Sequence, residues 1–185
     1  MPSNKIVQPP YAMSWSVLLA ALSALGPLSI DMYLSALPAM AADFGVSTQM
    51  VSNSLPAYFF GLAVGQLIYG PISDRIGRKP PLYFGLCLYI VASLLCVFAQ
   101  DEWSLIAARI LQALGGCVGV VMARAAIRDR LDMHSAAQAF ASMMIVTAIA
   151  PILAPSLGAW VLMFYEWNVI FLVLMGCGLL SLACV

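Results

Sequence analysis

Long apolar blocks without charges constrain the fold of this chain more than any other feature. The 185 residues are 63% hydrophobic and 9% charged, whereas soluble domains are about half apolar and about a quarter charged. A water-soluble core of this size cannot bury so much apolar surface, so lipid must surround most of the chain. A membrane-crossing helix needs about 20 mostly apolar residues, and six blocks meet this requirement. The blocks cover approximately residues 13–37, 52–73, 82–99, 104–125, 138–162 and 167–185.

The crossing segments are predicted to be helices. Backbone N–H and C=O groups in lipid must find partners within the protein, so only helices and closed barrels cross a membrane. A barrel strand needs about ten residues that alternate strictly in polarity, and the run LYFGLCLYIVASLLCVFA shows no such alternation. We therefore expect an all-α membrane protein, with a cytoplasmic N-terminus over residues 1–12 and a bundle of six transmembrane helices over residues 13–185.

The positions of the charges predict which loops face the cytoplasm. If six spans alternate, every basic residue outside the membrane interior falls on one side, and the other side carries only acidic residues. Positive charge marks the cytoplasmic side, so the loops 74–81 and 126–137 are expected there, and those near 38–50, 100–103 and 163–166 outside. The basic residues are Lys5, Arg75, Arg78, Lys79, Arg124, Arg128 and Arg130; the acidic residues opposite are Asp43, Asp101, Glu102 and Glu166.

Several functional classes lack any signal in the sequence. There is no HExxH pair, no GxxxxGK[ST] loop and no plausible Ser/His/Asp set, so we expect neither an enzyme nor a transporter driven by ATP hydrolysis. The five cysteines all lie in apolar runs without CxxC spacing, and His134 is the only histidine. No metal site, disulfide framework or nucleic-acid partner is therefore predicted. A cleaved signal peptide is not expected, because further spans follow the first.

Asp31 is one of two charged residues inside a predicted span. A charge at mid-membrane costs about 2.5–3.5 kcal/mol on insertion scales and usually faces protein or a wet cavity. Asp31 belongs to a polar stripe with four-residue spacing, which favours a protonatable carboxylate that lines a cavity; the alternative is a solvated residue at the outer mouth. Gly26 and Pro27 are expected to kink or loosen this helix. The stripe consists of Ser23, Pro27, Asp31 and Ser35.

Arg109 is the second charge inside a span and lies near the same depth as Asp31. Helical spacing places it on one face with Gln112, Gly116, Gly119 and Ala123, and Gly115 with Gly119 forms a GxxxG pattern that favours close helix contact. One interpretation is a role in coupling protons to substrate. The other is a structural counter-ion, or an arginine that extends outward to the interface. A direct or water-bridged contact between Arg109 and Asp31 is left open by the sequence.

The fifth span carries Pro151, Pro155 and Gly158 along one side. Two prolines four residues apart remove two backbone donors, which predicts a bent helix with small residues at the bend. The bend could be a hinge or sealed interface used in alternating access, or only a tolerated packing kink. Aromatic residues could line a drug cavity by stacking, or could instead face lipid or pack. These are Tyr33, Tyr58, Phe59 and Phe60.

The stretch GPISDRIGRKPP, residues 70–81, is a polar turn between two apolar runs. Gly70 is expected to allow close approach of another helix, and Gly77 to permit the sharp reversal. Asp74 can cap a helix or pair with an arginine, while Arg78 and Lys79 hold the loop in the cytoplasm. Pro80 and Pro81 are expected to start the next helix, where a missing N–H is harmless.

This turn resembles the signature of the major facilitator superfamily, Gly-x-x-x-Asp-Arg-x-Gly-Arg-(Arg/Lys), in its usual place between the second and third spans. Three further segments, GPLSIDMYLSALP, RILQALGG and APILAPSLGAW, are similar to the Bcr/CflA-type drug exporters, a group that includes bicyclomycin and chloramphenicol exporters. The resemblance covers all 185 residues but only the N-terminal six of the family's twelve spans. Four alanines stand where the family more often has glycine. The signature residues are Gly70, Asp74, Arg75, Gly77, Arg78 and Lys79; the alanines are Ala113, Ala150, Ala154 and Ala159.

The resemblance implies proton-coupled export of small amphipathic drugs or metabolites by alternating access in the cell inner membrane. It favours a role for Arg109 in coupling protons to substrate, and we expect Asp31, Gln112 and Tyr33 to belong to the same coupling site or substrate cavity. It further implies that Asp129 pairs with Arg75 or Arg78 and holds the cytoplasmic side closed in the outward-open state; the alternative is a solvated loop that only sets the topology. The expected energy source is the proton gradient, with no cofactor. The expected partners are the lipid bilayer, the substrate, protons, and a missing C-terminal half or a second copy.

Two other functions remain open from the sequence. The same fold could take up a sugar or another small solute, because a fold does not fix a substrate. The chain also ends inside an apolar run, LLSLACV, so we expect a fragment or a half-length chain, which could be an inactive membrane scaffold.

Overall fold

The computed structural model describes residues 13–185, which form eight helices and no strand, so the predicted all-α fold is confirmed. The prediction for residues 1–12, including Lys5, lies outside the described residues. The helices are α1 (Met13–Leu34), α2 (Leu37–Phe44), α3 (Thr48–Ser52), α4 (Ser54–Ile76), α5 (Lys79–Val97), α6 (Glu102–Arg130), α7 (Met133–Phe164) and α8 (Asn168–Ala183).

All six predicted blocks are helical, but they differ in length. Four stretches are long and apolar enough to cross a membrane, and a bent pair, Leu18–Leu34 with Leu37–Phe44, forms a fifth candidate. The last helix, α8, has 16 residues. At 1.5 Å per residue it is about 24 Å long, whereas the hydrocarbon core is about 30 Å thick. The sixth span is therefore shorter than the sequence predicted.

The first span is bent where α1 meets α2. We expected Gly26 and Pro27 to kink or loosen the helix; α1 includes Pro27 and continues as far as Leu34. The chain turns by 60° between α1 and α2. Pro38 lies in the first turn of α2, where its missing N–H is tolerated, but its ring prevents the preceding turn from continuing as one helix.

Predicted loops on both sides are more helical than expected. α6 continues to Arg130 and α7 starts at Met133, so most of the loop predicted at 126–137 is helix. Burial explains the extension, because Ile127 is fully buried in a cluster with Leu19 and Met143. The carboxylate of Asp132 then caps α7 by accepting a hydrogen bond from the His134 N–H at 3.2 Å. The outer loop predicted at 38–50 contains most of α2 and the start of α3.

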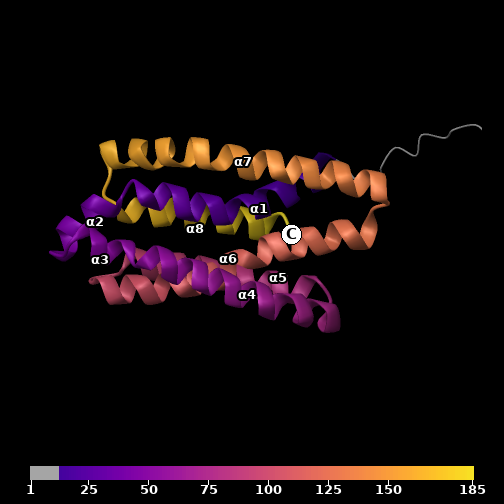
Figure 1. Ribbon diagram of the computed structural model, residues 1–185, viewed down its shortest axis with the longest axis horizontal. Helices are drawn as coiled ribbons and strands as arrows, with labels where there is room; N and C mark the ends of the chain where they lie inside the picture. Colours follow the sequence, from indigo (N-terminus) through magenta and orange to yellow (C-terminus); the bar gives the residue numbers. More distant parts are fainter. Residues whose placement is uncertain (1–12) are drawn as a thin grey trace, which may run out of the picture.

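The helices form two layers that pack on each other (Figure 1). In one layer lie α1, α7 and α8, and in the other α4, α5 and α6; the most extensive contacts are α5–α6, α4–α6, α1–α7 and α5–α8. The short turns between α4 and α5 and between α6 and α7 lie at the same end of the bundle, opposite α2 and α3 (Figure 1). The basic residues of both turns are therefore at one end, as the alternation of spans predicted.

Close helix contacts depend on glycines that have no room for a side chain. A Cβ atom on Gly119 would lie 2.5 Å from the carbonyl oxygen of Leu22 on α1, and one on Gly115 would collide with the backbone of Tyr89 on α5. The GxxxG pattern of α6 therefore makes the close contacts that it predicted, one with α1 and one with α5. Gly158 of α7 makes a similar contact, because a Cβ there would lie 2.6 Å from the carbonyl oxygen of Met32.

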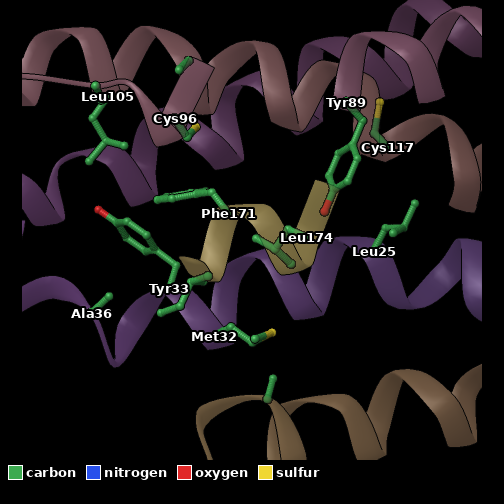
Figure 2. Packing of buried hydrophobic residues seen from close by; sticks show 14 of the residues in the cluster. Leu25, Met32, Tyr33, Ala36, Tyr89, Cys96, Leu105, Cys117, Phe171 and Leu174 are labelled. Atoms are coloured by element: carbon green, nitrogen blue, oxygen red, sulfur yellow. The ribbon is translucent and has the colours of Figure 1, made fainter. Parts of the chain in front are cut away.

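The core lies where α1, α5, α6 and α8 meet. Tyr33 of α1 and Phe171 of α8 are fully buried, with ring centroids 6.1 Å apart, and Figure 2 shows the two rings next to each other, tilted, beneath Leu105 and Cys96. Phe171 thus anchors α8 to α1 in this region. The charged residue Arg109 is enclosed in the same part of the core.

Candidate functional site

Arg109 is the largest fully buried side chain among the described residues, with 0% of its surface exposed. Its guanidinium carbon lies 4.4 Å from the ring centroid of Tyr33 and 4.2 Å from that of Tyr58. The ring of Phe171 is 6.0 Å away. Helices α1, α4 and α8 thus cover an arginine that α6 supplies, so Arg109 is enclosed within this bundle and does not extend to the interface.

One hydrogen-bonded chain fixes the guanidinium from α6 and α5. Arg109 Nη1 donates to Gln112 Oε1 at 2.6 Å, and Gln112 Nε2 donates to Ser93 Oγ at 2.8 Å. The Ser93 hydroxyl donates in turn to the Tyr89 carbonyl oxygen at 2.8 Å. Arg109 and Gln112 are one helical turn apart, so the sequence spacing itself brings them together.

The two tyrosines stabilise the cation by their ring faces. A guanidinium over an aromatic face gains about 2 kcal/mol or more where water is excluded. The position of Tyr33 is itself fixed, because its hydroxyl donates to the Val51 carbonyl oxygen at 3.1 Å and also hydrogen bonds to Ser54. The Tyr33 hydroxyl thus connects α1 to Val51 of α3 and to Ser54 at the start of α4.

The electrostatics of Arg109 are not fully balanced within the described residues. Its Nε and Nη2 groups and the Tyr58 hydroxyl have no hydrogen-bond partner among these residues. No carboxylate pairs with Arg109, since the ion pairs found among these residues all involve Arg78. A buried cation with two free donors is costly, which suggests that the site is retained for a function other than stability.

Asp31 lies apart from this site, although it is near the same depth. Its side chain is partly exposed and forms no hydrogen bond or ion pair among the described residues. Tyr33 occupies the core face of α1 and contacts Arg109. Residues two apart on a helix differ by about 200°, so Asp31 is directed away from the core. The direct contact that the sequence left open between Asp31 and Arg109 is absent from this structure.

The polar stripe on α1 contacts α7 over part of its length. The Ser35 hydroxyl donates to the Pro155 carbonyl oxygen at 3.1 Å, and Gly158 contacts the backbone of Met32. Ser23 is fully buried, with its hydroxyl bonded to the Leu19 carbonyl oxygen at 2.7 Å. Only part of the expected stripe is therefore accessible.

Helix α7 carries the predicted proline and glycine segment without a break. It runs as one helix of 32 residues with Pro151 and Pro155 inside it, so any bend stays within a continuous helix. Gly158 and the carbonyl group of Pro155 face α1, whereas Pro151 is exposed. The two prolines thus do not share one contact surface in this structure.

A second cluster of charges lies at the turn between α4 and α5. Arg78 Nε donates to Asp129 Oδ2 at 2.9 Å, and Arg78 Nη1 donates to Asp74 Oδ1 at 2.7 Å and to Ser73 Oγ at 2.6 Å. The hydrogen-bonded carboxylate of Asp129, together with that of Asp74, raises the pKa of the Arg78 guanidinium. Of the two arginines considered as partners of Asp129, Arg78 makes the contact.

Other residues of this turn are placed differently. Gly77 adopts a φ of +90° and ends α4, as the expected reversal requires. Gly70 does not mediate a close helix contact, because a Cβ there would meet nothing within 4 Å; that prediction was wrong. Arg75 and Lys79 are exposed and make no ion pair among the residues that the structure describes.

Some members of the buried site were not predicted from the sequence. Ser93 was not singled out, although a lone hydroxyl in an apolar span is a signal of a buried polar contact. Phe171 gave no signal, because an aromatic residue in a span usually packs or faces lipid. Tyr58 was considered as a stacking residue, together with Phe59 and Phe60; only Tyr58 turns inward, and the latter two are 53% and 65% exposed.

The fold and the buried site together define a helical membrane protein whose basic turns lie at one end. The chain belongs to the Major Facilitator Superfamily, whose family model matches residues 19–185. It is 41% identical over 170 residues to the uncharacterized MFS-type transporter YdgK of Bacillus subtilis (strain 168), an alignment that covers 91% of this chain and 42% of that relative. Membership in a transporter family agrees with the prediction that the chain is not an enzyme.

Proteins named multidrug resistance protein MdtL form a second set of relatives. The chain is 37% identical over 165 residues to MdtL of Escherichia coli O139:H28 (strain E24377A / ETEC), which covers 88% of this chain and 42% of that relative. MdtL of Shigella boydii serotype 18 (strain CDC 3083-94 / BS512) gives the same values. The chain thus spans less than half the length of the curated relatives that it matches.

Proposed function

We propose that this chain forms the N-terminal half of a Bcr/CflA-type exporter, which exchanges protons for small amphipathic drugs or metabolites across the cytoplasmic membrane. The observation that carries the proposal is the enclosed Arg109, held by Gln112 and by the rings of Tyr33 and Tyr58. Relatives named for multidrug resistance support the substrate class. A C-terminal half, or a second copy, supplies the rest of the transport path.

Helix α1 is the element that links proton binding to Arg109 in this proposal. Asp31 lies on the accessible face of α1 and takes up the proton, while Tyr33 on the opposite face contacts the guanidinium. Protonation removes a negative charge from α1 and changes the depth and tilt that the helix prefers. A shift of α1 moves Tyr33 relative to Arg109. Proton binding on one face of the helix and the contact with Arg109 on the other face therefore depend on the same conformational equilibrium. Substrate and proton then alter each other's affinity by the same factor.

The Arg78 cluster acts as the cytoplasmic closure in the same proposal. It joins the end of α6, through Asp129, to the turn between α4 and α5, and all three side chains are partly exposed to solvent. Exposed ion pairs are weak, so the contact can break and re-form during each cycle. The proposed orientation places this cluster and the N-terminus in the cytoplasm, and the proposed energy source is the proton gradient without a cofactor.

The experiment is to reconstitute the intact transporter into liposomes and to measure drug-dependent proton flux with a pH-sensitive dye. We expect Asp31→Asn to retain drug binding but to lose drug-dependent proton flux, because the amide cannot titrate. Glu166→Gln is the matched control, since it removes an exposed carboxylate from the connection between α7 and α8, toward the same end of the bundle. Unchanged coupled flux in Asp31→Asn would remove Asp31 from the mechanism. Drug movement that does not depend on the pH gradient in the unmodified protein would refute proton-coupled export.

A further inference from the structure

An apolar groove runs between α4 and α5, with a volume of about 430 Å³. Its walls include Ile72 and Ile76 on α4 and Pro80 and Phe84 on α5, and Leu114 of α6 contributes to its floor. The groove exists because α4 and α5, although consecutive, pack far more on α6 than on each other. Nearly all of its lining is apolar, so water is a poor occupant.

Two free cations flank the cytoplasmic end of this groove. Arg75 directly precedes Ile76, and Lys79 directly precedes Pro80, so each is next in sequence to a residue that lines the groove. Both are exposed and make no ion pair among the described residues. The nearest acidic side chain in sequence, Asp74, is bound to Arg78 at 2.7 Å. The local positive charge is therefore not used within the bundle.

We propose that the groove binds an anionic phospholipid, with an acyl chain between α4 and α5 and the phosphate group on Arg75 and Lys79. An apolar slot that ends in unpaired basic residues complements both parts of such a lipid. Basic pockets on the cytoplasmic side of membrane proteins bind anionic lipid headgroups. The proposal depends on the membrane location of the bundle and not on the transported substrate or on proton coupling.

The geometry favours a lipid over a soluble anion. Arg75 and Lys79 are both exposed, and an isolated phosphate would remain hydrated at exposed cations. An acyl chain adds apolar contact in the groove, which contributes about 0.8 kcal/mol per buried methylene. Headgroup and chain together therefore bind where neither would bind alone.

The test is a lipid titration of the purified, delipidated protein in detergent, followed by native mass spectrometry. We expect phosphatidylglycerol to bind and to raise the melting temperature more than phosphatidylcholine does. The double variant Arg75→Gln/Lys79→Gln should bind phosphatidylglycerol about 30-fold more weakly. Arg128→Gln/Arg130→Gln, which removes two exposed cations at the same end of the bundle, should retain the affinity of the unmodified protein.

A second variant tests the groove itself. Ile72→Trp should fill the slot and weaken binding of phosphatidylglycerol while leaving both cations in place. Equal binding of the two lipids would overturn the proposal, as would equal loss in both double variants, or a protein dimer in place of bound lipid. Stabilisation by inorganic phosphate equal to that by phosphatidylglycerol would show a simple anion site and would also overturn it.

Discussion

At the scale of single residues, Arg109 combines high burial with incomplete pairing. It is fully enclosed, yet only Nη1 has a hydrogen-bond acceptor among the described residues. Cation–π contacts with Tyr33 and Tyr58 offset part of the desolvation cost, but an apolar side chain of similar size would have no such cost. A residue that is unfavourable for stability and is nevertheless held by several helices fits a role in function.

The stability and the transport activity of the variant Arg109→Met test this role. Replacement of buried ionic groups by apolar residues is often neutral, or stabilising by about 1–4 kcal/mol, so the melting temperature should be unchanged or higher. Drug-dependent proton flux should be lost. Arg124→Met, which changes an exposed arginine of the same helix, should retain the flux. A large loss of stability in Arg109→Met, with flux retained per folded molecule, would assign Arg109 a structural role instead.

At the scale of elements, the helices approach one another at glycines and separate where side chains intervene. Gly158→Ala would place a methyl group 2.6 Å from the Met32 carbonyl oxygen and should force α7 away from α1. We expect a loss of about 1–3 kcal/mol in stability, measured by thermal or denaturant unfolding in detergent. Gly176→Ala is the control, because a Cβ at this helical position meets nothing within 4 Å; it should be neutral or stabilising. Equal effects would show that close α1–α7 packing is not required.

The turn between α4 and α5 gives a second prediction at this scale. Gly77 has a φ of +90° and a ψ of 171°, a conformation that other residues adopt only at a cost of about 1–3 kcal/mol. Gly77→Ala should therefore lower stability by this amount and weaken the contact of Arg78 with Asp129. Gly70→Ala, in an open part of α4, should be tolerated. The prediction fails if Gly70→Ala is the more damaging change in an unfolding assay.

At the scale of the whole molecule, the two basic turns lie at one end, and the contact between Arg78 and Asp129 joins them (Figure 1). The opposite end carries α2, α3 and the connection between α7 and α8. This arrangement predicts that Met133→Cys and Tyr165→Cys, each made in a variant without the five native cysteines, are labelled from opposite sides of the membrane. Both positions are exposed, at 91% and 60%.

A membrane-impermeant thiol reagent is the appropriate probe for this test. In intact cells it should label the cysteine at position 165 and should reach the cysteine at position 133 only after permeabilisation. Labelling of both positions from the same side would contradict the alternation of spans and the assignment of the basic end to the cytoplasm.

The sequence predicted some features well because they depend on local chemistry. Gly77 at a reversal, the helix start before Pro80 and Pro81, and the GxxxG contact of α6 all follow from the properties of glycine and proline. The bend near Pro38 was not predicted because the first span contains two prolines, and only the structure shows that α1 continues past Pro27 and ends before Pro38. Ser93 and Phe171 were missed because their partners lie on other helices, far away in the sequence.

The sequence by itself determined that lipid surrounds this chain, that its spans are helices and that its basic connectors share one side, because these follow from apolar length and charge position. Only the tertiary structure decided that Tyr33 contacts Arg109 and that Asp31 does not. The physical reason is the rotation of α1 in the bundle. Packing against α6, α7 and α8 sets which face of the helix points inward, and no local rule fixes that angle.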